Sequence, residues 1–256
     1  MSGQEMPWKI CLAINESCLL SLVAKNVPEL EQMRVHVWQA SLDQPDSKVE
    51  DFYETLAKAE QERASGFLLE GQRRDFVVCR GILRIIMAGY LGINPAEVEF
   101  GTAPQGKPIL KTGCGNGLGV KFSLSHSGRL ALFAVSMDCD IGVDIECMSA
   151  LRDIEGIAEG FFSQREYAQY QTLPPKKRRE AFFRCWTRKE ACLKALGTGF
   201  SLSPHCFTVS LLPDEPAALL EDNAPGKIGR LELFDITTFP GYCAALAFLR
   251  PTLLSN

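Results

Sequence analysis

The chain has 256 residues, of which 46% are apolar and 23% charged, a composition typical of a globular protein that buries one large core or two small ones. Its formal net charge of −4 gives no general attraction to nucleic acid or to an anionic membrane, so any anion site must be built from local basic residues. No segment approaches the roughly 18 apolar residues of a membrane span. We therefore expect neither a nucleic-acid partner nor a membrane partner.

The cysteines and the N-terminus indicate where the protein works. The ten cysteines form no C-x-x-C pair and no His/Cys cluster at zinc spacing, so we expect reduced thiols without a metal role. Residues 1–9 lack the basic start and apolar run of a signal peptide. Both features predict a cytoplasmic protein.

The first half of the chain predicts a strand, two helices and three further strands. Hydrophobic periodicity places these elements at 35–38 (strand), 49–67 and 73–90 (helices), and 98–100, 121–124 and 130–135 (strands). The glycine run at 113–119 resembles a phosphate-binding loop, but it neither follows a strand directly nor opens a helix. A hairpin loop is the better interpretation.

The second half repeats this pattern. Its predicted elements are a strand at 141–145, a helix at 179–196 ended by Gly197, and strands at 207–211, 231–236 and 242–249. Aligning the two long helices without gaps pairs Arg80 with Glu190. We therefore predict an α+β fold with a pseudo-two-fold duplication, in which each α/β half has a mainly antiparallel sheet packed on a long helix. The expected boundary divides residues 1–138 from 139–256.

The strand at 142–146 (GVDIE) carries two acids on one face. Because residues two apart on a strand point the same way, Asp144 and Glu146 lie side by side while their apolar neighbours enter the core. Adjacent carboxylates repel unless a cation lies between them, and their hard oxygens suit magnesium. An exposed strand edge with two solvated acids fits this pentapeptide equally well.

The long helix of the second half adds three charged residues near its apolar stripe. Lys189 falls within the stripe, where a buried ammonium needs an anionic partner. Glu190 and Lys194 lie on its flank, one turn apart, and could also form an ordinary surface pair. Arg80 is a similar charge near the apolar face of the first-half helix. Two such charges near a pair of acids indicate a site.

Two polar segments could hold a phosphate. Residues 122–128 (FSLSHSG) place three serines and a histidine at the end of a strand, and residues 105–108 (QGKP) place a lysine in a turn. Taken alone, each segment is explained as well by an ordinary turn with solvated side chains.

In combination, these segments resemble the 4'-phosphopantetheinyl transferase superfamily, in its large two-half type that activates peptide, polyketide and fatty-acid synthases, as in surfactin-synthetase activation. The motifs that carry the resemblance, in the family's order, are 106–108 (GKP), 122–127 (FSLSHS), 142–146 (GVDIE) and 186–191 (WTRKEA) followed by Lys194.

The resemblance implies a role for each matching position. Asp144, Glu146 and Glu190 would bind Mg²⁺, Lys194 would contact the pyrophosphate of coenzyme A, and Glu190 and Lys194 would be catalytic. The remaining coenzyme A-binding positions would be Arg63, Arg80, Gly106, Lys107, Pro108, Ser125, His126 and Lys189. Glu190 would accept the proton of a carrier-protein serine, directly or through a water.

The expected reaction moves 4'-phosphopantetheine from coenzyme A to a serine of an apo acyl or peptidyl carrier protein, leaving adenosine 3',5'-bisphosphate. With two halves in one chain, we expect a monomer. The residues alone also permit a magnesium-dependent hydrolase of a nucleotide or of coenzyme A, or a non-catalytic module that binds carrier proteins. The basic run at 176–179 is best explained as a solvated helix entry, with nucleic-acid binding or carrier docking as alternatives.

Overall fold

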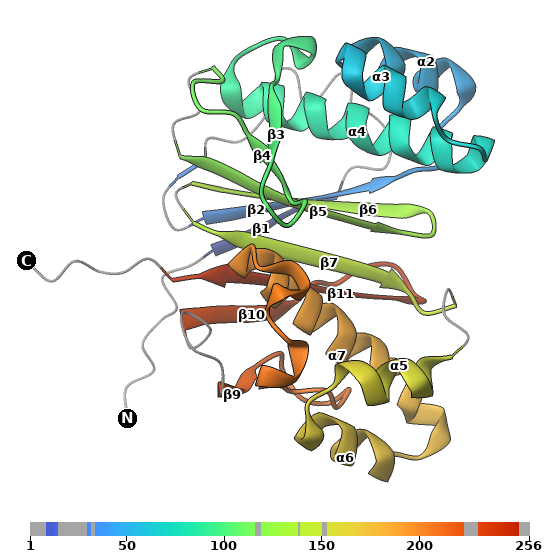
Figure 1. The fold of residues 1–256 in the computed structure, drawn as a ribbon, viewed down its shortest axis with the longest axis vertical. Coiled ribbons are helices and arrows are strands. Elements are labelled where there is room, and N and C mark those ends of the chain that lie inside the picture. Colours follow the sequence, from blue (N-terminus) through green and yellow to red (C-terminus); the bar gives the residue numbers. More distant parts are fainter. Residues whose placement is uncertain are drawn as a thin grey trace, which may run out of the picture.

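The computed structural model describes residues 9–14, 30–31, 34–115, 119–137, 139–149, 153–222 and 230–250. Within them, two β-sheets lie face to face, with helix α4 covering the outer face of one and helix α7 the outer face of the other (Figure 1). The first sheet has the strand order β1-β2-β6-β5 and the second β10-β11-β7. Two short hairpins, β3-β4 and β8-β9, complete the described strands.

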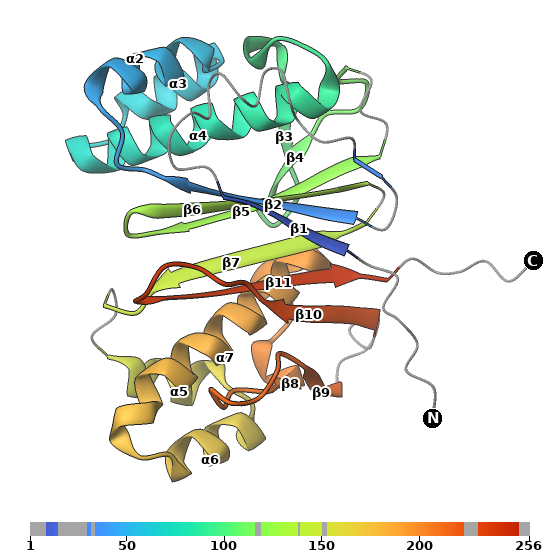
Figure 2. The ribbon, with the colours of Figure 1, turned by 180° about the vertical axis from the view of Figure 1, so that it is seen from behind.

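The N-terminal half contains the first sheet and the helices that cover it (Figure 2). Its elements are β1 (Lys9–Ile14), β2 (Arg34–Ser41), α2 (Asp46–Thr55), α3 (Lys58–Ser65), α4 (Glu70–Leu91), the 3₁₀ turn η1 (Pro95–Glu97), β3 (Phe100–Thr102), β4 (Pro108–Leu110), β5 (Val120–Ser127) and β6 (Leu130–Met137).

The C-terminal half contains the second sheet. Its elements are β7 (Ile141–Cys147), α5 (Ile154–Phe161), α6 (Gln164–Thr172), α7 (Pro175–Leu196), η2 (Gly199–Ser201), η3 (Pro204–Cys206), β8 (Phe207–Val209), β9 (Leu219–Asp222), β10 (Leu231–Asp235) and β11 (Tyr242–Leu249).

Three apolar clusters hold these layers together. One lies between α4 and the first sheet, and a second lies between α7 and the second sheet. The third fills the space between the sheets, where Val35, Leu132, Val143 and Leu246 are fully buried or nearly so. Because alternate residues of a strand face opposite ways, the apolar residues of each central strand can serve both an outer and an inner cluster.

The predicted α+β duplication is confirmed by the strand order. In the first half β2, β6 and β5 pair antiparallel in that order, and β7, β11 and β10 do so in the second. The helices α4 and α7 each span 22 residues and end at a glycine in the left-handed conformation, Gly92 and Gly197. Left-handed backbone favours glycine, which explains both helix ends.

The gapless pairing of Arg80 with Glu190 is wrong in register. Matching the helices by their lengths and glycine ends pairs Arg80 with Cys185. The strand contacts agree: the last turn of α4 meets β2 through Tyr90 and His36, and the last turn of α7 meets β7 at Gly142. Apolar positions recur every turn, so the sequence pattern permits several registers.

The predicted helix at 49–67 is two helices, α2 and α3. Leu56 adopts an extended backbone and buries its side chain, which interrupts the helix. Glu60 then accepts a hydrogen bond from the amide of Ala57, 3.0 Å away, and so caps the start of α3. The other predicted strands and long helices are found within a few residues of their expected bounds.

Several short elements were not predicted: β1, β4, β9, α5 and α6. For α6 a signal existed, because Ser163 and Glu166 form a capping box at its start. The glycine run at 113–119 is loop at its described positions, and residues 116–118 lie outside the described residues. Free thiols are found at Cys79, Cys114, Cys139, Cys147, Cys185, Cys192, Cys206 and Cys243. No described helix is long and apolar enough to cross a membrane.

We predict that Gly142→Ala disrupts the packing of α7 on β7. A Cβ at Gly142 would lie 2.0 Å from the carbonyl oxygen of Ala191 and 2.4 Å from the amide of Ala195, both backbone atoms that cannot rotate away. The variant should lose about 1–3 kcal/mol of unfolding free energy or more, measured by urea denaturation. Gly160→Ala on α5 is the control, because nothing lies within 4 Å of its Cβ and alanine favours a helix. Equal stability of the two variants would contradict this packing.

Candidate active site

The two acids of β7 face α7 at the junction between the halves. Val143 and Ile145 enter the cluster between the sheets, so Gly142, Asp144 and Glu146 lie on the opposite face of the strand. Gly142 lets the backbone of α7 approach closely, which brings the helix next to the acids. Asp144 is 3% exposed and Glu146 is half-buried.

Serine hydroxyls from the other half hold both acids. The strands β5 and β7 belong to different sheets but lie in contact. Across this contact Ser125 donates a hydrogen bond to Asp144 Oδ1 at 2.7 Å, and Ser127 donates to Glu146 Oε2 at 2.7 Å. The acids of the C-terminal half therefore depend on β5 of the N-terminal half for their orientation.

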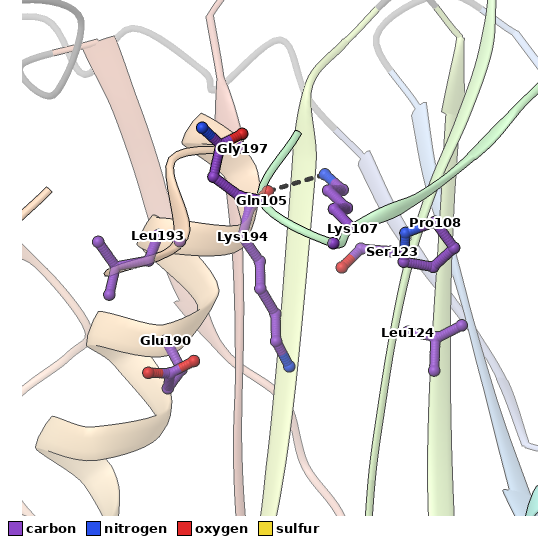
Figure 3. A pocket seen from close by; sticks show the side chains of 11 residues that line it. Gln105, Lys107, Pro108, Ser123, Leu124, Glu190, Leu193, Lys194 and Gly197 are labelled. Carbon is purple, nitrogen blue, oxygen red and sulfur yellow. Dashed lines mark hydrogen bonds between the residues drawn. The ribbon is translucent and has the colours of Figure 1, made fainter. Parts of the chain in front are cut away.

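Helix α7 contributes Glu190 and, one turn later, Lys194 (Figure 3). The ammonium of Lys194 donates to Asp144 Oδ1 at 2.7 Å, to Ser125 Oγ at 3.0 Å and to the carbonyl of Val143 at 3.1 Å. A lysine has three donors, so all of them are used within the protein. Contact with a phosphate would require Lys194 to exchange at least one of these partners.

Two carboxylate oxygens at this site have no partner. Asp144 Oδ2 and Glu190 Oε1 are buried and accept no hydrogen bond, which is costly for acidic groups. The pKa of Glu190 is raised to about 7, mainly by burial and also by the charge of Asp144 and the weaker effect of Glu146, while Lys194 opposes the rise. Burial also raises the pKa of Glu146, opposed by its bond from Ser127. The site therefore holds more negative charge than its own cations neutralise.

The structure brings Asp144, Glu146 and Glu190 into one neighbourhood, but not into a finished ligand cage. Among the residues that the structure describes, no group of three or more His, Cys, Asp or Glu side chains is arranged to hold a metal ion. Glu146 has one oxygen committed to Ser127, whereas Asp144 and Glu190 each offer a free buried oxygen. These two acids fit a cation directly.

Lys107 joins the two halves. It follows the turn of the β3-β4 hairpin, and its ammonium donates to the carbonyls of Ile141, at 2.8 Å, and Lys194, at 2.7 Å (Figure 3). The second contact places a positive charge at the C-terminal end of α7, where the helix dipole favours it. Burial lowers the pKa of Lys107 to about 8, and the charges of Lys121 and Lys194 contribute. One donor remains available to a ligand.

Two neighbouring cavities open along this junction. The junction cavity, of about 230 Å³, is lined by Gln105, Gly106, Lys107, Pro108, Ser123, Leu124, Glu190, Leu193, Lys194, Gly197 and Gly199. The N-terminal cavity, of about 610 Å³, is lined by Arg63, Phe67, Gln72, Asp75, Phe76, Cys79, Arg80, Leu83, Thr102, Gly106, Pro108, Leu124 and His126. They share Gly106, Pro108 and Leu124, so one ligand could extend through both.

The basic residues of the N-terminal cavity are held in place by ring and ion contacts. Arg63 lies over the ring of Phe76, 5.0 Å from its centroid, and Arg80 lies 4.7 Å from that of Phe100. Arg80 also pairs with Glu60 at 2.9 Å. Glu60 was missed in the sequence, because its position in a charged helix gives no signal of this contact.

Two expected coenzyme A ligands lie elsewhere. Lys189 is fully buried and binds both carboxylate oxygens of Glu166, at 2.8 and 2.7 Å, and the carbonyl of Phe207 at 2.6 Å. Its predicted role in binding coenzyme A is therefore wrong, although it has the anionic partner that its position required. Ser125 turns its hydroxyl to Asp144 and Lys194, away from the cavity that His126 lines.

The basic run at 176–179 stabilises the C-terminal half. Arg178 donates to the carbonyls of Leu173 and Gln171, and Arg179 donates to that of Met148. These guanidinium groups therefore secure the start of α7 to neighbouring segments.

Comparison with known proteins identifies the family. The family model described as 4'-phosphopantetheinyl transferase superfamily matches residues 140–247, and the one described as 4'-phosphopantetheinyl transferase, N-terminal, matches residues 36–138. The chain belongs to the 4'-phosphopantetheinyl transferase superfamily. It is thus an enzyme that transfers phosphopantetheine from coenzyme A to a carrier protein, which sets aside the hydrolase and the non-catalytic module.

Curated relatives agree with this assignment. The chain is 43% identical over 185 residues to the 4'-phosphopantetheinyl transferase HetI of Nostoc sp., covering 72% of this chain and 77% of the relative. It is 26% identical over 214 residues to the transferase Sfp of Bacillus subtilis strain 168, covering 82% and 90%. A solved apo-ACPS chain attributed to Chronobacterium ammoiniagenes aligns at 25% identity, covering 43% of this chain and 95% of that one, with a TM-score of 0.34, too low to establish a shared fold.

We predict that Lys189→Ala damages stability and leaves coenzyme A binding intact. Removing the ammonium leaves Glu166 as a buried charge without its cation, which typically costs about 3–5 kcal/mol of unfolding free energy. The KM for coenzyme A of the folded variant should stay within about twofold of wild type, because Lys189 is fully buried away from both cavities. Lys177→Ala, which removes an exposed ion pair, is the control and should cost under about 1 kcal/mol. A raised KM with normal stability would restore the binding role.

Proposed function

We propose that the transferase binds magnesium between Asp144 and Glu190 and binds coenzyme A along the two cavities beside them. One observation carries the cation site: two buried carboxylate oxygens, from strand β7 and helix α7, have no hydrogen-bond partner. Hard oxygen ligands of this kind suit magnesium. Bound there, the ion would neutralise charge on the pyrophosphate of coenzyme A.

The N-terminal half supplies the binding of the nucleotide end. Arg63, Arg80 and His126 line the N-terminal cavity, and their charges and donors suit phosphate groups. The backbone of Gly106 and Pro108 lies where the two cavities meet, so the nucleotide end can lie in one cavity and the pyrophosphate in the other. This division assigns residues 1–138 to nucleotide binding and residues 139–256 to the cation and the chemistry.

Lys194 is the residue best placed to respond to the substrate. Its ammonium pairs with Asp144 at 2.7 Å. A cation on Asp144 would take over that role and repel the ammonium, leaving Lys194 free to contact the pyrophosphate. The lysine then stabilises charge on the leaving group, which is the main task of residues in phosphoryl transfer.

Glu190 is our candidate for the base that accepts the proton of the carrier serine. It lines the junction cavity and has a buried oxygen without a hydrogen-bond partner, so it can reach both the cation and the acceptor. A carboxylate has two oxygens, so one can hold the cation while the other accepts the proton, directly or through a water. The acceptor is an apo acyl or peptidyl carrier protein, and the chain acts as a cytoplasmic monomer without nucleic acid or membrane.

The proposal is tested by mixing the protein with coenzyme A, magnesium and several apo carrier proteins, and weighing the carriers by mass spectrometry. We predict that Asp144→Ala and Glu190→Ala each slow transfer by at least about a hundredfold, because a lost ligand removes several kcal/mol of transition-state stabilisation. Asp51→Ala removes an exposed carboxylate on α2 and should keep transfer within about twofold. Near-normal rates in both site variants at limiting magnesium would disprove the cation site.

We also predict that Glu190 lowers the unfolding free energy by an amount that depends on pH. Its folded pKa of about 7 exceeds the ordinary value of 4.5, so between these values the folded protein binds more protons at this group than the unfolded chain does. The contribution of Glu190 to the unfolding free energy must therefore fall as pH rises from about 4.5 to above 7.

Glu190→Gln tests this cost, because the amide has no proton to lose. In chelator-treated buffer, the unfolding free energy of wild type relative to Glu190→Gln should fall between pH 5 and pH 8. Added magnesium should restore wild type at pH 8 and leave Glu190→Gln nearly unchanged. A difference between the two proteins that does not vary with pH would contradict the raised pKa.

A further inference from the structure

The strands β5 and β7 are joined by serine side chains at alternate positions. Ser123 Oγ accepts a hydrogen bond from the amide of Val143 at 3.1 Å, and Ser127 Oγ accepts one from the amide of Cys147 at 3.0 Å. Between them, Ser125 bonds to Asp144. Hydroxyl groups of β5 thus occupy the place that backbone carbonyls take in a sheet, and they fix the register of β7 against the other half.

The hydrogen bonds of Ser127 determine where its hydroxyl proton points. Because it accepts the amide of Cys147, its own hydrogen must be directed elsewhere, and Glu146 Oε2 lies 2.7 Å away. A hydroxyl carries a single donor, so the bond to Glu146 is its only donation. Ser127 therefore engages Oε2 of Glu146, and Trp186 also bonds this carboxylate.

Ser125 follows the same logic at Asp144. It accepts from Lys194 at 3.0 Å and donates to Asp144 Oδ1, leaving Oδ2 buried without a partner. In each case a serine that accepts one hydrogen bond is directed to donate to one carboxylate oxygen, and the second oxygen is not used by that serine. Ser123 differs, because its hydroxyl accepts a hydrogen bond from the backbone amide of Val143 in β7.

We propose that Ser127 is a positioning residue of the transfer reaction, which aligns Glu146 beside the cation site from the opposite half of the chain. This inference rests on the proposed function, in which Asp144 and Glu190 hold the cation. Residues that orient the acids around a metal typically change its affinity or the activity by about 10- to 100-fold when they are removed. Removing the Ser127 hydroxyl should therefore change the magnesium dependence of coenzyme A binding more than it changes the stability of the fold.

Calorimetric binding of coenzyme A to the full chain tests the proposal without turnover. For Ser127→Ala, we expect the Kd for coenzyme A at limiting magnesium to rise about tenfold, and saturating magnesium to return it to within about twofold of wild type. Ser127→Thr keeps the hydroxyl and should bind as wild type does. If the alanine variant does not fold, Ser127→Cys gives the same comparison, because a thiol is a weak donor of similar size.

Ser136→Ala is the matched control. It also removes a buried hydroxyl that joins the two halves, by donating to the carbonyl of Cys139 at 2.7 Å, and Ser136 lines neither cavity. Its Kd should stay within about twofold of wild type at both magnesium concentrations. An equal shift in Ser136→Ala and Ser127→Ala, or a shift that persists at saturating magnesium, would reduce Ser127 to a structural residue and overturn the proposal.

A double-mutant comparison asks whether Ser127 acts through Glu146. In a Glu146→Ala background, adding Ser127→Ala should change the Kd by less than about twofold, because the acid that it positions is gone. A full tenfold effect in that background would refute the assignment.

If Asp144→Ala keeps wild-type dependence on magnesium, the cation site itself is wrong. If Asp144→Ala loses that dependence while Ser127→Ala keeps it, only the role of Ser127 is wrong.

Discussion

The contact between β5 and β7 is the constraint on which the site depends. Each strand belongs to a different sheet, and serine hydroxyls of one half bond to the backbone and carboxylates of the other. The acids of β7 are thus oriented by residues of β5, a strand that is separated from β7 in the chain only by β6. Separating the halves would remove the serine donor of each acid, which couples the association of the halves to the formation of the site.

Three lysines near α7 differ in whether their partners can be exchanged for a cation. Lys189 is neutralised by Glu166 in the interior, and Lys107 donates to two backbone carbonyls and has no carboxylate to exchange for a cation. Lys194 differs, because its partner Asp144 also carries a free buried oxygen. Only there can a cation replace the ammonium without leaving the acid uncompensated. Of these three, Lys194 is therefore the one that can change partners during the reaction.

Sequence reasoning predicted the fold and the common face of the two acids on β7, because both follow from local pattern. Alternation along residues 141–145 places Asp144 on the outer face of β7, and Gly92 and Gly197 mark the ends of the long helices. It failed for contacts between distant segments. Nothing in the local sequence connects Lys189 to Glu166, or Ser125 to Asp144, since these pairs form only when separate elements pack. The same limit explains the wrong register between α4 and α7.

The duplication explains why charge of opposite sign meets at the junction. Equivalent helices lie outside equivalent sheets, yet α4 presents Arg80 to the N-terminal cavity and α7 presents Glu190 to the junction cavity. An anionic substrate needs cationic groups at its phosphates, whereas a metal ion that bridges those phosphates needs anionic ligands on its other side. One half could not place both sets close together without neutralising them against each other, as Glu60 already does for Arg80. Dividing them between two halves leaves Asp144 Oδ2 and Glu190 Oε1 available to a cation, while Lys194 pairs with the other oxygen of Asp144.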